Sequence, residues 1–583
     1  MKKTIYAAGW SCMGILLFLY LSQSFAFNYF YIEQFRLFRF HWDYAAQLLS
    51  HPGGAAEYAA SFLIQFFIHP HVGPGVATLL FISISLGMRG ICKRLAPERE
   101  WPLAYLTPGI LLLMADLDFN YHLEGTLAFA WVVGVLNVYL RIHSQTVRMV
   151  FMVLAAGILY GVAGSAFFAA LLCALVYEYL TGSISSWKPP VMFALGLIPA
   201  LADYFTGTGG EARMYFLPDA YFNPRLPAQA ILYYAWGSLP GIMLFLLLSR
   251  RFKTKATPKA GLKYGLLLLQ VLLAGGMLHY GCRTYHLKNL YEVKKMDYYS
   301  RTSQWDALLS LPLRSGQNAM HACFQNLALA QKGILAEKFL SFNQTGTNGL
   351  WINWNRTCTV SSLLSDVYYA MGHIAQAQRM AFEGMVASEW GTNPRLLLRL
   401  VKTNLICGNH AVAGKYIHLL EDTYAYRQEA LALKKLAGND SAVANDPELG
   451  DKRRCMVHTS GLSEMPADLL QIAHSNPDDP TALEYLGLFF LMDKNIPFFD
   501  RWVAPLYGPE KRSPLPKVFQ EAVILAHEGD TASWSKYGVS PQTIRRFQGY
   551  RQAILSNRRG AAPADKLRAS YGDTYWYYYM FKK

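Results

Sequence analysis

Apolar residues form long runs up to about residue 282 and short, regularly spaced groups after it. A helix needs about 20 mostly apolar residues to cross the hydrocarbon core of a bilayer, so the runs predict transmembrane helices. Nine are expected, at 5–26, 73–91, 101–115, 124–141, 149–164, 166–182, 189–206, 229–249 and 264–282. The pattern predicts an all-α protein with a polytopic membrane domain over 1–282 and a second domain over 283–583.

Beyond residue 300 the apolar positions follow the helical period in short segments. Three segments align without gaps, with steps of 39 and 36 residues, and each has a glycine followed three positions later by an alanine: Gly333 and Ala336, Gly372 and Ala375, Gly408 and Ala411. They resemble the tetratricopeptide repeat, in which paired helices meet through small residues near a glycine turn. Ala377 and Ala413 fit its alanine position, and Lys338 departs from it. The resemblance implies an α-solenoid of helical hairpins.

Three further segments complete the expected second domain. A fourth repeat unit is expected to begin at Asn476, where Asn-Pro-Asp-Asp-Pro precedes an apolar run. Residues 436–465 are rich in Gly, Asn, Asp, Ser and Lys and predict an insertion or long loop. The aromatic end around 575–581 predicts either a segment packed on the repeats or one that binds an interface or a partner.

Composition and charge place the chain in the cell envelope. With 53% hydrophobic and 16% charged residues, it does not have the composition of a soluble multidomain protein. If the N-terminus is cytoplasmic, fifteen basic residues of short loops and ends lie inside and four lie outside, namely Arg36, Arg39, Arg213 and Arg225. With nine spans, the second domain then lies outside the cytoplasm. Cleavage of 1–26 as a signal peptide is an alternative that leaves this orientation unchanged.

The net charge of +15 does not indicate a nucleic-acid partner. The excess of basic residues in the membrane half follows from its predicted topology, and the tail holds no basic run. Attraction of the tail to the lipid bilayer is the expected consequence. Of eight cysteines, five fall outside the membrane, where at most two disulfides are possible with unassigned pairing. Buried, unpaired cysteines in helices are the alternative. No cofactor is indicated.

Carboxylates of the membrane half gather at its predicted outer face. This group consists of Glu33, Asp43, Glu57, Asp116, Asp118, Glu124, Asp203, Glu211 and Asp219. Such a group suits base catalysis or metal binding, although the positive-inside bias also produces it. Asp116, Asp118 and His122 have a spacing that permits a metal, but capping or loop solvation is the simpler interpretation. Residues 33–49 have helical apolar spacing and predict an interfacial helix ended by Pro52-Gly53-Gly54.

The first span, an outer loop with an acid and an interfacial helix, and acids at the edge of a later span resemble the membrane-embedded GT-C glycosyltransferases. These enzymes move sugars from polyprenyl-phosphate carriers. The resemblance covers residues 1–141 and implies Glu33 or Asp43 as the catalytic base, with Asp116 or Asp118 as a second site. Arg36, Arg39, Arg213 and Arg225 are the expected phosphate-binding residues. No Asp-Glu or Asp-x-Asp pair occurs in the first loop, which departs from the enzymes' pattern.

Over the whole chain, the run from Glu33 through Trp42-Asp43-Tyr44 to Glu57-Tyr58 is similar to an uncharacterised family of Bacteroides-type multipass membrane proteins with tetratricopeptide-like tails. That similarity implies an envelope location and no particular chemistry. Three functions follow as hypotheses: a transferase using a polyprenyl-phosphate sugar, a membrane-anchored scaffold whose tail binds an envelope protein or peptide, and a transporter in which Glu178 is the clearest intramembrane acid.

Overall fold

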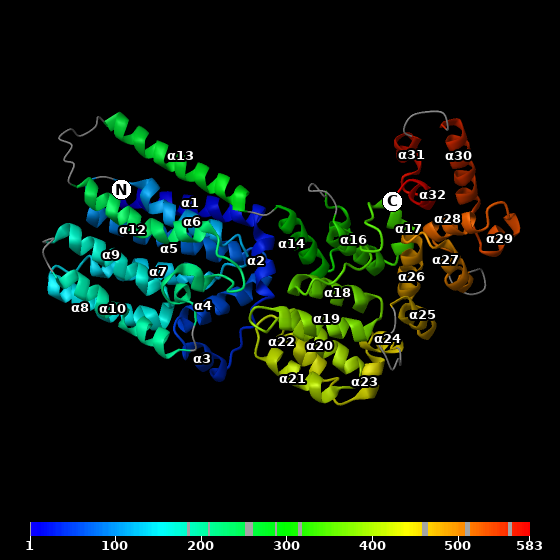
Figure 1. Cartoon of the computed structure of the whole chain (residues 1–583), viewed down its shortest axis with the longest axis horizontal. Coiled ribbons are helices and arrows are strands. Elements are labelled where there is room, and N and C mark those ends of the chain that lie inside the picture. The colour runs from blue at the N-terminus through cyan, green and yellow to red at the C-terminus, as the bar shows by residue number, and fades with distance from the viewer. Residues whose placement is uncertain are drawn as a thin grey trace. The chain divides into compact units, whose positions relative to one another are not determined.

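The computed structural model describes residues 2–98, 100–182, 187–207, 210–250, 260–285, 288–312, 318–456, 465–507, 514–557 and 563–582. Within these ranges the chain is helical and contains no β-strand beyond two isolated bridges. It divides into two compact units (Figure 1). The membrane unit comprises 1–291 with 422–425, and the tail comprises 292–421 and 426–583. All eight cysteines are described and none forms a disulfide, in agreement with the unpaired alternative.

The membrane unit is a bundle of helices of very different lengths. Its helices are α1 (Lys2–Ser24), α2 (Ala26–Glu33), α3 (Trp42–Leu49), α4 (Gly54–Ile64), α5 (Val72–Leu95), α6 (Pro102–Ala115), α7 (Leu123–Tyr139), α8 (Gln145–Ala163), α9 (Ala166–Thr181), α10 (Lys188–Thr206), α11 (Ala212–Phe216), α12 (Ala230–Ser249) and α13 (Ala260–Tyr285), with 3-10 turns η1 (Gln65–Ile68) and η2 (Pro218–Tyr221). The helix pair α8–α9 turns at Gly164-Ser165.

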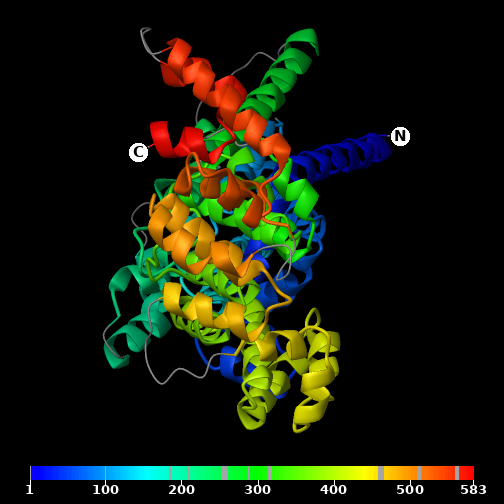
Figure 2. The ribbon, with the colours of Figure 1, turned by 90° about the vertical axis from the view of Figure 1, so that its right-hand side faces the viewer.

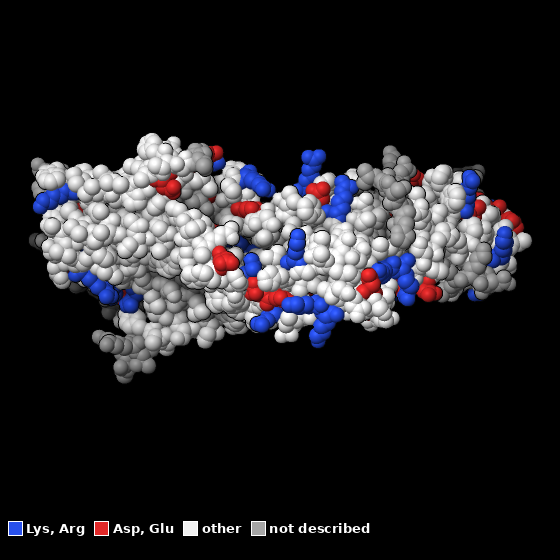
Figure 3. Space-filling view, turned by 90° about the horizontal axis from the view of Figure 1, so that it is seen from below, with Lys and Arg blue, Asp and Glu red and all other residues white. Residues whose placement is uncertain are grey.

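Helices occupy all nine segments that the apolar runs mark. Six of them, α1, α5, α8, α10, α12 and α13, are long and apolar enough to cross a membrane. The other three, α6, α7 and α9, have 14, 17 and 16 residues and are shorter than a typical span. In Figure 3 the part of the drawn face that belongs to the membrane helices carries few charged side chains. The described residues therefore contain six candidate membrane spans, which is compatible with a membrane protein.

The prediction of one interfacial helix over 33–49 is wrong. Helix α2 ends at Glu33, residues 36–41 lie in no helix, and a separate helix, α3, begins at Trp42. Phe38 is buried among aromatic rings, including those of Tyr44 and Tyr58 at 5.5 and 5.2 Å. Of the apolar residues with helical spacing, Phe38 and Ala45 are buried, whereas Leu49 is exposed. Trp42 itself is exposed.

The tail consists of shorter helices. They are α14 (Lys288–Arg301), which crosses the boundary between the units, α15 (Trp305–Leu309), α16 (Ala319–Gln331), α17 (Leu335–Lys338), α18 (Cys358–Ala370), α19 (Ile374–Ala387), α20 (Pro394–Ile406), α21 (His410–Glu421), α22 (Arg427–Lys434), α23 (Asp440–Asn445), α24 (Leu449–Arg454), α25 (Met465–Ser475), α26 (Thr481–Met492), α27 (Ile496–Trp502), α28 (Lys517–Ala526), α29 (Thr531–Lys536), α30 (Pro541–Asn557), α31 (Pro563–Tyr571) and α32 (Tyr575–Phe581), with 3-10 turns η3 (Phe339–Ser341) and η4 (Ala504–Leu506).

One hydrogen-bonded turn recurs along the tail. In it, a residue with positive φ follows a helix, and the next N–H donates to the carbonyl five positions earlier, which is the Schellman arrangement. The bonds are 2.8–3.0 Å long and follow Ser303, Gly333, Gly372, Gly408, Lys494 and Gly538. The three glycines of the sequence alignment therefore end helices as expected. Ser303 and Lys494 place the same turn at positions without glycine.

Small residues bring the paired helices together, although at fewer positions than the alignment indicates. Ala336, Ala377 and Ala413 are fully buried, whereas Ala375 and Ala411 are exposed. Helices α18 to α21 pack in sequence, each against the next. The expected loop over 436–465 instead contains the short helices α23 and α24, and part of it, 457–464, lies outside the described residues.

The aromatic end of the chain packs on the tail, as the first of its two alternatives predicts. Tyr575 and Trp576 are fully buried, and Tyr577 and Tyr578 nearly so. The indole Nε1 of Trp576 donates to the carbonyl of Glu521 at 2.9 Å, and the hydroxyl of Tyr575 donates to the carbonyl of Leu491 at 3.0 Å. Helix α32 therefore closes the end of the tail against α26 and α28, next to α30 and α31 (Figure 2).

Two glycine turns of the tail provide a matched pair of substitutions. Gly333 and Gly372 have φ of 66° and 81°, but a Cβ at Gly333 meets no atom within 4 Å, whereas a Cβ at Gly372 lies 2.8 Å from that of Cys455. Gly333→Ala is expected to cost about 1 kcal/mol from the left-handed backbone. Gly372→Ala has the same backbone cost and also crowds its Cβ against Cys455, so it is expected to cost about 2–3 kcal/mol in total. Urea unfolding of the detergent-solubilised protein, read by hydrogen exchange in α16 and α18, measures both. Equal costs would contradict the packing of α18 against Cys455.

Candidate functional site

A buried ionic cluster surrounds Arg36 in the membrane unit. Its guanidinium, 7% exposed, donates to Glu57 on α4 at 3.1 Å and to Glu124 at the start of α7 at 2.6 Å. His51 lies 3.4 Å from Glu57, and His122 lies 3.4 Å from Glu124. We refer to these five residues as the Arg36 cluster. Two carboxylates thus face one guanidinium, with an imidazole beside each carboxylate.

Backbone contacts between loops hold the α6–α7 loop, which contains Asp116, Asp118 and His122. The N–H of His122 donates to the carbonyl of Tyr221, and Tyr121 forms a β-bridge with Phe222. The hydroxyl of Tyr221 donates to the carbonyl of Ala163 and accepts from the N–H of Ala166 at 3.0 Å, so it also fixes the α8–α9 turn. The loops that carry the expected site are thus joined to one another.

Each of the four expected catalytic acids has different surroundings. Glu33 is buried at the end of α2, and Asp116 is buried and accepts from Thr126 at 3.1 Å. Asp118 accepts hydrogen bonds from Asn120 in the same loop and from Gln229, which lies just before α12. Asp43, in the first turn of α3, has a side chain that is 86% exposed and lies 3.5 Å from His41. Three of the four acids therefore have protein surroundings, and the fourth faces outward.

The four expected phosphate-binding arginines are also separate. Arg36 belongs to the buried cluster, and Arg39 pairs with Asp422 at 3.0 Å. Arg213 pairs with Glu211 and lies 3.8 Å from Asp219. Arg225 is exposed in a turn with Asn223. Of the expected residues, Arg36 contacts two buried carboxylates, Glu57 and Glu124, and Arg213 lies near a third, Asp219.

The other carboxylates of the membrane unit have partners that stabilise the bundle. Glu178 is fully buried and accepts from Tyr139 at 2.6 Å, Gln145 at 3.1 Å and Arg148 at 2.6 and 3.0 Å. Asp219 accepts from Tyr233 at 2.7 Å. Among the described residues, no group of three or more potential ligands is placed to hold a metal ion, including Asp116, Asp118 and His122.

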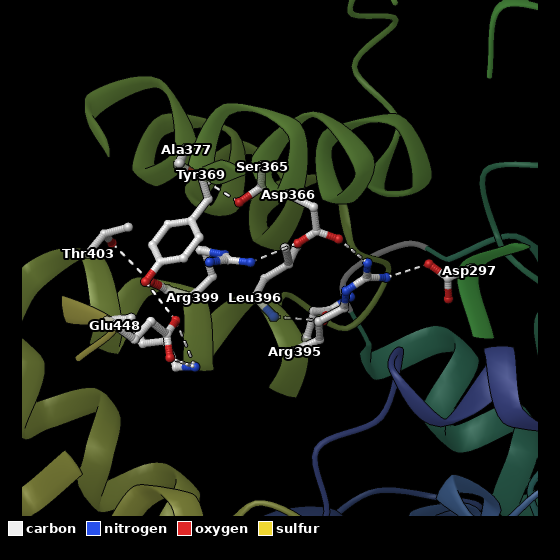
Figure 4. A network of polar contacts seen from close by, with 12 residues as sticks. Asp297, Ser365, Asp366, Tyr369, Ala377, Arg395, Leu396, Arg399, Thr403 and Glu448 are labelled. Atoms are coloured by element: carbon white, nitrogen blue, oxygen red, sulfur yellow. Dashed lines mark hydrogen bonds and ion pairs between the residues drawn. The ribbon is translucent and has the colours of Figure 1, made fainter. Parts of the chain in front are cut away.

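A second ionic network, which no pattern in the sequence indicates, lies in the tail (Figure 4). Arg395 on α20 donates to Asp297 on α14 at 2.6 Å and to Asp366 on α18, which also accepts from Arg399 at 3.0 Å. The guanidinium of Arg399 lies 3.7 Å from the ring centre of Tyr369, whose hydroxyl donates to Glu448. The network ties three helices to the segment before α24.

Burial alone would raise the pKa of Asp366, but Arg395 and Arg399 hold it below its ordinary value. Burial would likewise lower the pKa of Arg395, yet Asp297 and Asp366 raise it. Glu448 behaves as Asp366 does, because Lys402 outweighs its burial and lowers its pKa. The ionised forms of Asp366, Arg395 and Glu448 are therefore stabilised by their neighbours, which is the behaviour of a structural network rather than of a proton donor or acceptor poised near neutrality.

Two further tail carboxylates accept hydrogen bonds from backbone N–H groups. Glu484 accepts the N–H of Ala336 near the start of α17 at 3.2 Å, and Glu521 accepts the N–H of Tyr575 at the start of α32 at 2.7 Å. Burial raises the pKa of Glu484 to about 7 and that of Glu521 to about 8. For Glu521, Lys517 and Arg546 oppose this rise and Asp573 adds to it. Both carboxyls cap the start of another helix.

Glu521 makes the docking of α32 depend on pH. A carboxyl whose pKa rises on folding binds its proton more tightly in the folded state, so stability is full below its unfolded value and falls as pH rises toward about 8. Between about pH 5.5 and 7.5 the loss is expected to be about 2–3 kcal/mol, and Glu521→Gln is expected to abolish it. Hydrogen exchange of Tyr575–Phe581, corrected for intrinsic rates, measures the loss. Asp530→Asn, at an exposed helix cap, is the control; a wild-type slope in the Gln variant would contradict the assignment.

Comparison with known proteins adds one relationship. A family model described as a family of unknown function matches residues 2–582. No curated protein and no solved structure matches the chain.

Proposed function

Because that match spans almost the whole chain, the protein belongs to this family of unknown function, DUF6057, and we propose that it is a membrane-anchored scaffold whose tail binds an envelope protein or peptide. The observation that carries the proposal is the recurrence of one helix turn after Ser303, Gly333, Gly372, Gly408, Lys494 and Gly538. Recurrent helical hairpins stack into extended surfaces that mostly bind proteins.

In this proposal the tail is an α-solenoid of tetratricopeptide-like hairpins. Its support is the close approach of paired helices at Ala377 and Ala413 and the successive packing of α18 to α21. Turns that follow Ser303 and Lys494 extend the hairpins beyond the three glycine-marked units. Lys338, which departs from the alanine position of the repeat, lies in α17. This helix has only four residues, so this unit is a shortened repeat.

The proposed topology has nine spans, a cytoplasmic N-terminus and a tail on the far side of the inner membrane. In it α6, α7 and α9 cross the membrane in addition to the six longer helices, and their support is that α7 and α9 lie deep within the bundle. The orientation rests on the fifteen-to-four distribution of basic residues in short loops.

A surface of the tail suits a protein partner. On α19, Phe382 and Val386 lie four residues apart on one face of the helix and are 54% and 60% exposed. Exposed apolar pairs on one helix face mark interaction sites more often than isolated apolar residues do. The hydrogen bonds that Glu178 accepts from Tyr139, Gln145 and Arg148 add to the support, because a scaffold needs such a group only to hold its anchor together.

Site-specific photo-crosslinking in living cells tests the scaffold. A benzophenone side chain at Phe382 or Val386 is expected to give one discrete adduct with a second polypeptide. The same group at Gln428, an exposed polar position of α22, is expected to give none. Adducts only within the chain itself, or none from any tail position, would refute the proposal.

The glycosyltransferase remains a second proposal, and the Arg36 cluster is the observation that favours it. Ionisable residues buried in a membrane protein commonly mark functional sites. Here Arg36 would hold the carrier's phosphate while Glu33, Asp43, Asp116 or Asp118 takes the acceptor's proton. Turnover of a polyprenyl-phosphate sugar by the purified protein tests this, beside Glu33→Gln, Asp43→Asn, Asp116→Asn and Asp118→Asn with the thermal stability of each. Loss of turnover in a variant that melts like the wild type would identify the base; no turnover by the wild type would refute the proposal.

A further inference from the structure

The membrane unit contains an apolar groove between α1 and α13. Its volume is about 610 Å³. The lining residues come from four helices and are Tyr6, Trp10, Met13 and Leu17 of α1, Phe81 of α5, Leu106 and Ile110 of α6, and Val271, Ala274 and Leu278 of α13. α1 packs on α5, and α13 packs on α6. The two outer helices therefore leave the groove between them open toward the surrounding hydrocarbon.

The groove narrows at one end and opens at the other. At the narrow end the hydroxyl of Tyr20 on α1 lies 3.4 Å from Nδ1 of His279 on α13. From there the two helices diverge in both views, toward the N-terminus of α1 (Figures 1 and 2). Small residues widen the groove, since a Cβ at Gly9 or Gly275 would meet no atom within 4 Å.

Basic residues lie at the open end. The guanidinium of Arg89 on α5 sits 5.0 Å from the ring centre of Tyr6, a lining residue. Arg89 and Lys93 both pair with Glu100, at 2.8 and 2.6 Å. Among these three residues, two positive charges share one carboxylate, which leaves one positive charge. Lys93 is 42% exposed and is available to a further anion.

From this geometry we infer that the groove binds an anionic phospholipid of the membrane, with an acyl chain between α1 and α13 and its phosphate beside Arg89 and Lys93. A transmembrane helix, about 10 Å across and about 30 Å long, is much too large for this volume. A hydrocarbon chain matches the apolar lining and reaches the groove from the bilayer without leaving it. The net positive charge at the open end selects an anionic headgroup.

Native mass spectrometry of the full-length protein in detergent tests the site, with phosphatidylglycerol and phosphatidylcholine of identical chains as probes. The wild type is expected to retain one phosphatidylglycerol and to prefer it about fivefold, the ratio expected for one basic charge near a lipid surface. Gly275→Phe fills the groove and is expected to reduce retention of both lipids about tenfold or more. Lys93→Gln is expected to abolish the headgroup preference without reducing retention of phosphatidylcholine.

Gly241→Phe is the matched control. Gly241 lies on α12, is exposed, also has no atom within 4 Å of a Cβ, and does not line the groove. Its variant is expected to bind lipid like the wild type and to melt like Gly275→Phe. Equal retention by the two glycine variants would overturn the site. A wild-type dimer that Gly275→Phe converts to a monomer would overturn it in favour of a second copy, and equal binding of both lipids by the wild type would overturn the assigned headgroup.

Discussion

Replacing Arg395 with methionine is expected to lower the free energy of unfolding of the tail by about 3–5 kcal/mol. The guanidinium bridges Asp297 and Asp366, and its side chain is only 11% exposed. Methionine fills the volume but leaves Asp297, 4% exposed, as a buried carboxylate without its cation. Removing one partner of a buried ion pair costs much more than the pair contributes, because the remaining charge keeps its desolvation penalty. Urea unfolding followed by hydrogen exchange in α18 and α20 measures the loss.

Surface pairs of the tail provide the comparison for Arg395. Arg454 pairs with Asp451 at 2.8 Å but is 64% exposed, and Arg454→Met is expected to change stability by less than about 0.5 kcal/mol. Adding Asp297→Asn to Arg395→Met is expected to recover part of the loss, since it removes the orphaned charge. If Arg395→Met unfolds like Arg454→Met, the network does not hold the three helices together.

The pH dependence of the same variants has a defined sign. In the wild type the pKa of Asp366 is lowered, so its contribution is full above the unfolded value and is lost as the pH falls through the folded value. In Arg395→Met, Asp366 has lost one of the two cations that lower its pKa, so less of this contribution is left to be lost in acid. The difference in stability between the variant and the wild type is therefore expected to shrink in acid. A difference that is constant with pH would indicate lost packing instead of lost pairing.

Local signals in the sequence predicted the parts of the fold that depend on local physics. Runs of apolar residues gave the nine helical segments, and glycines gave the turns at 333, 372 and 408. Turns at Ser303 and Lys494 were missed because neither residue type favours positive φ; hydrogen bonds and packing around them fix the backbone there. The hydrophobic spacing of 33–49 misled because, of the spaced residues, only Phe38 and Ala45 are buried, and Phe38 lies in the segment before α3.

The candidate site was less predictable because its pairings are distant in sequence. Arg36 meets Glu124 across 88 positions, and Arg395 meets Asp297 across 98. The sequence shows that the carboxylates near the outer ends exceed the arginines, but it does not show which acid receives which base. One signal was available for Glu57 and Glu124, since acids beside apolar segments are costly to bury unless paired. It identifies acids that need a partner and leaves the partner unnamed.

Replacing Arg36 with methionine is expected to destabilise the membrane unit by a similar amount, about 3–5 kcal/mol, and to reduce the folded protein recovered from membranes. The substitution leaves Glu57 and Glu124, which are only 13% and 8% exposed, without the cation that they share. Arg225→Met, at an exposed turn, is the matched control and is expected to fold like the wild type. Thermal unfolding in detergent and the yield of monodisperse protein measure both variants.

Neutralising the acids separates a structural role of the Arg36 cluster from a catalytic one. The triple variant Arg36→Met, Glu57→Gln, Glu124→Gln removes both orphaned charges, and its stability is expected to return most of the way to that of the wild type. If the scaffold proposal holds, this variant also keeps the photo-crosslink at Phe382, because the cluster then serves only to anchor the tail. If the transferase proposal holds, the variant folds but has lost the guanidinium that binds the carrier's phosphate, and sugar turnover stops. Failure of the triple variant to recover stability would show instead that the side chain of Arg36 is needed for reasons other than its charge.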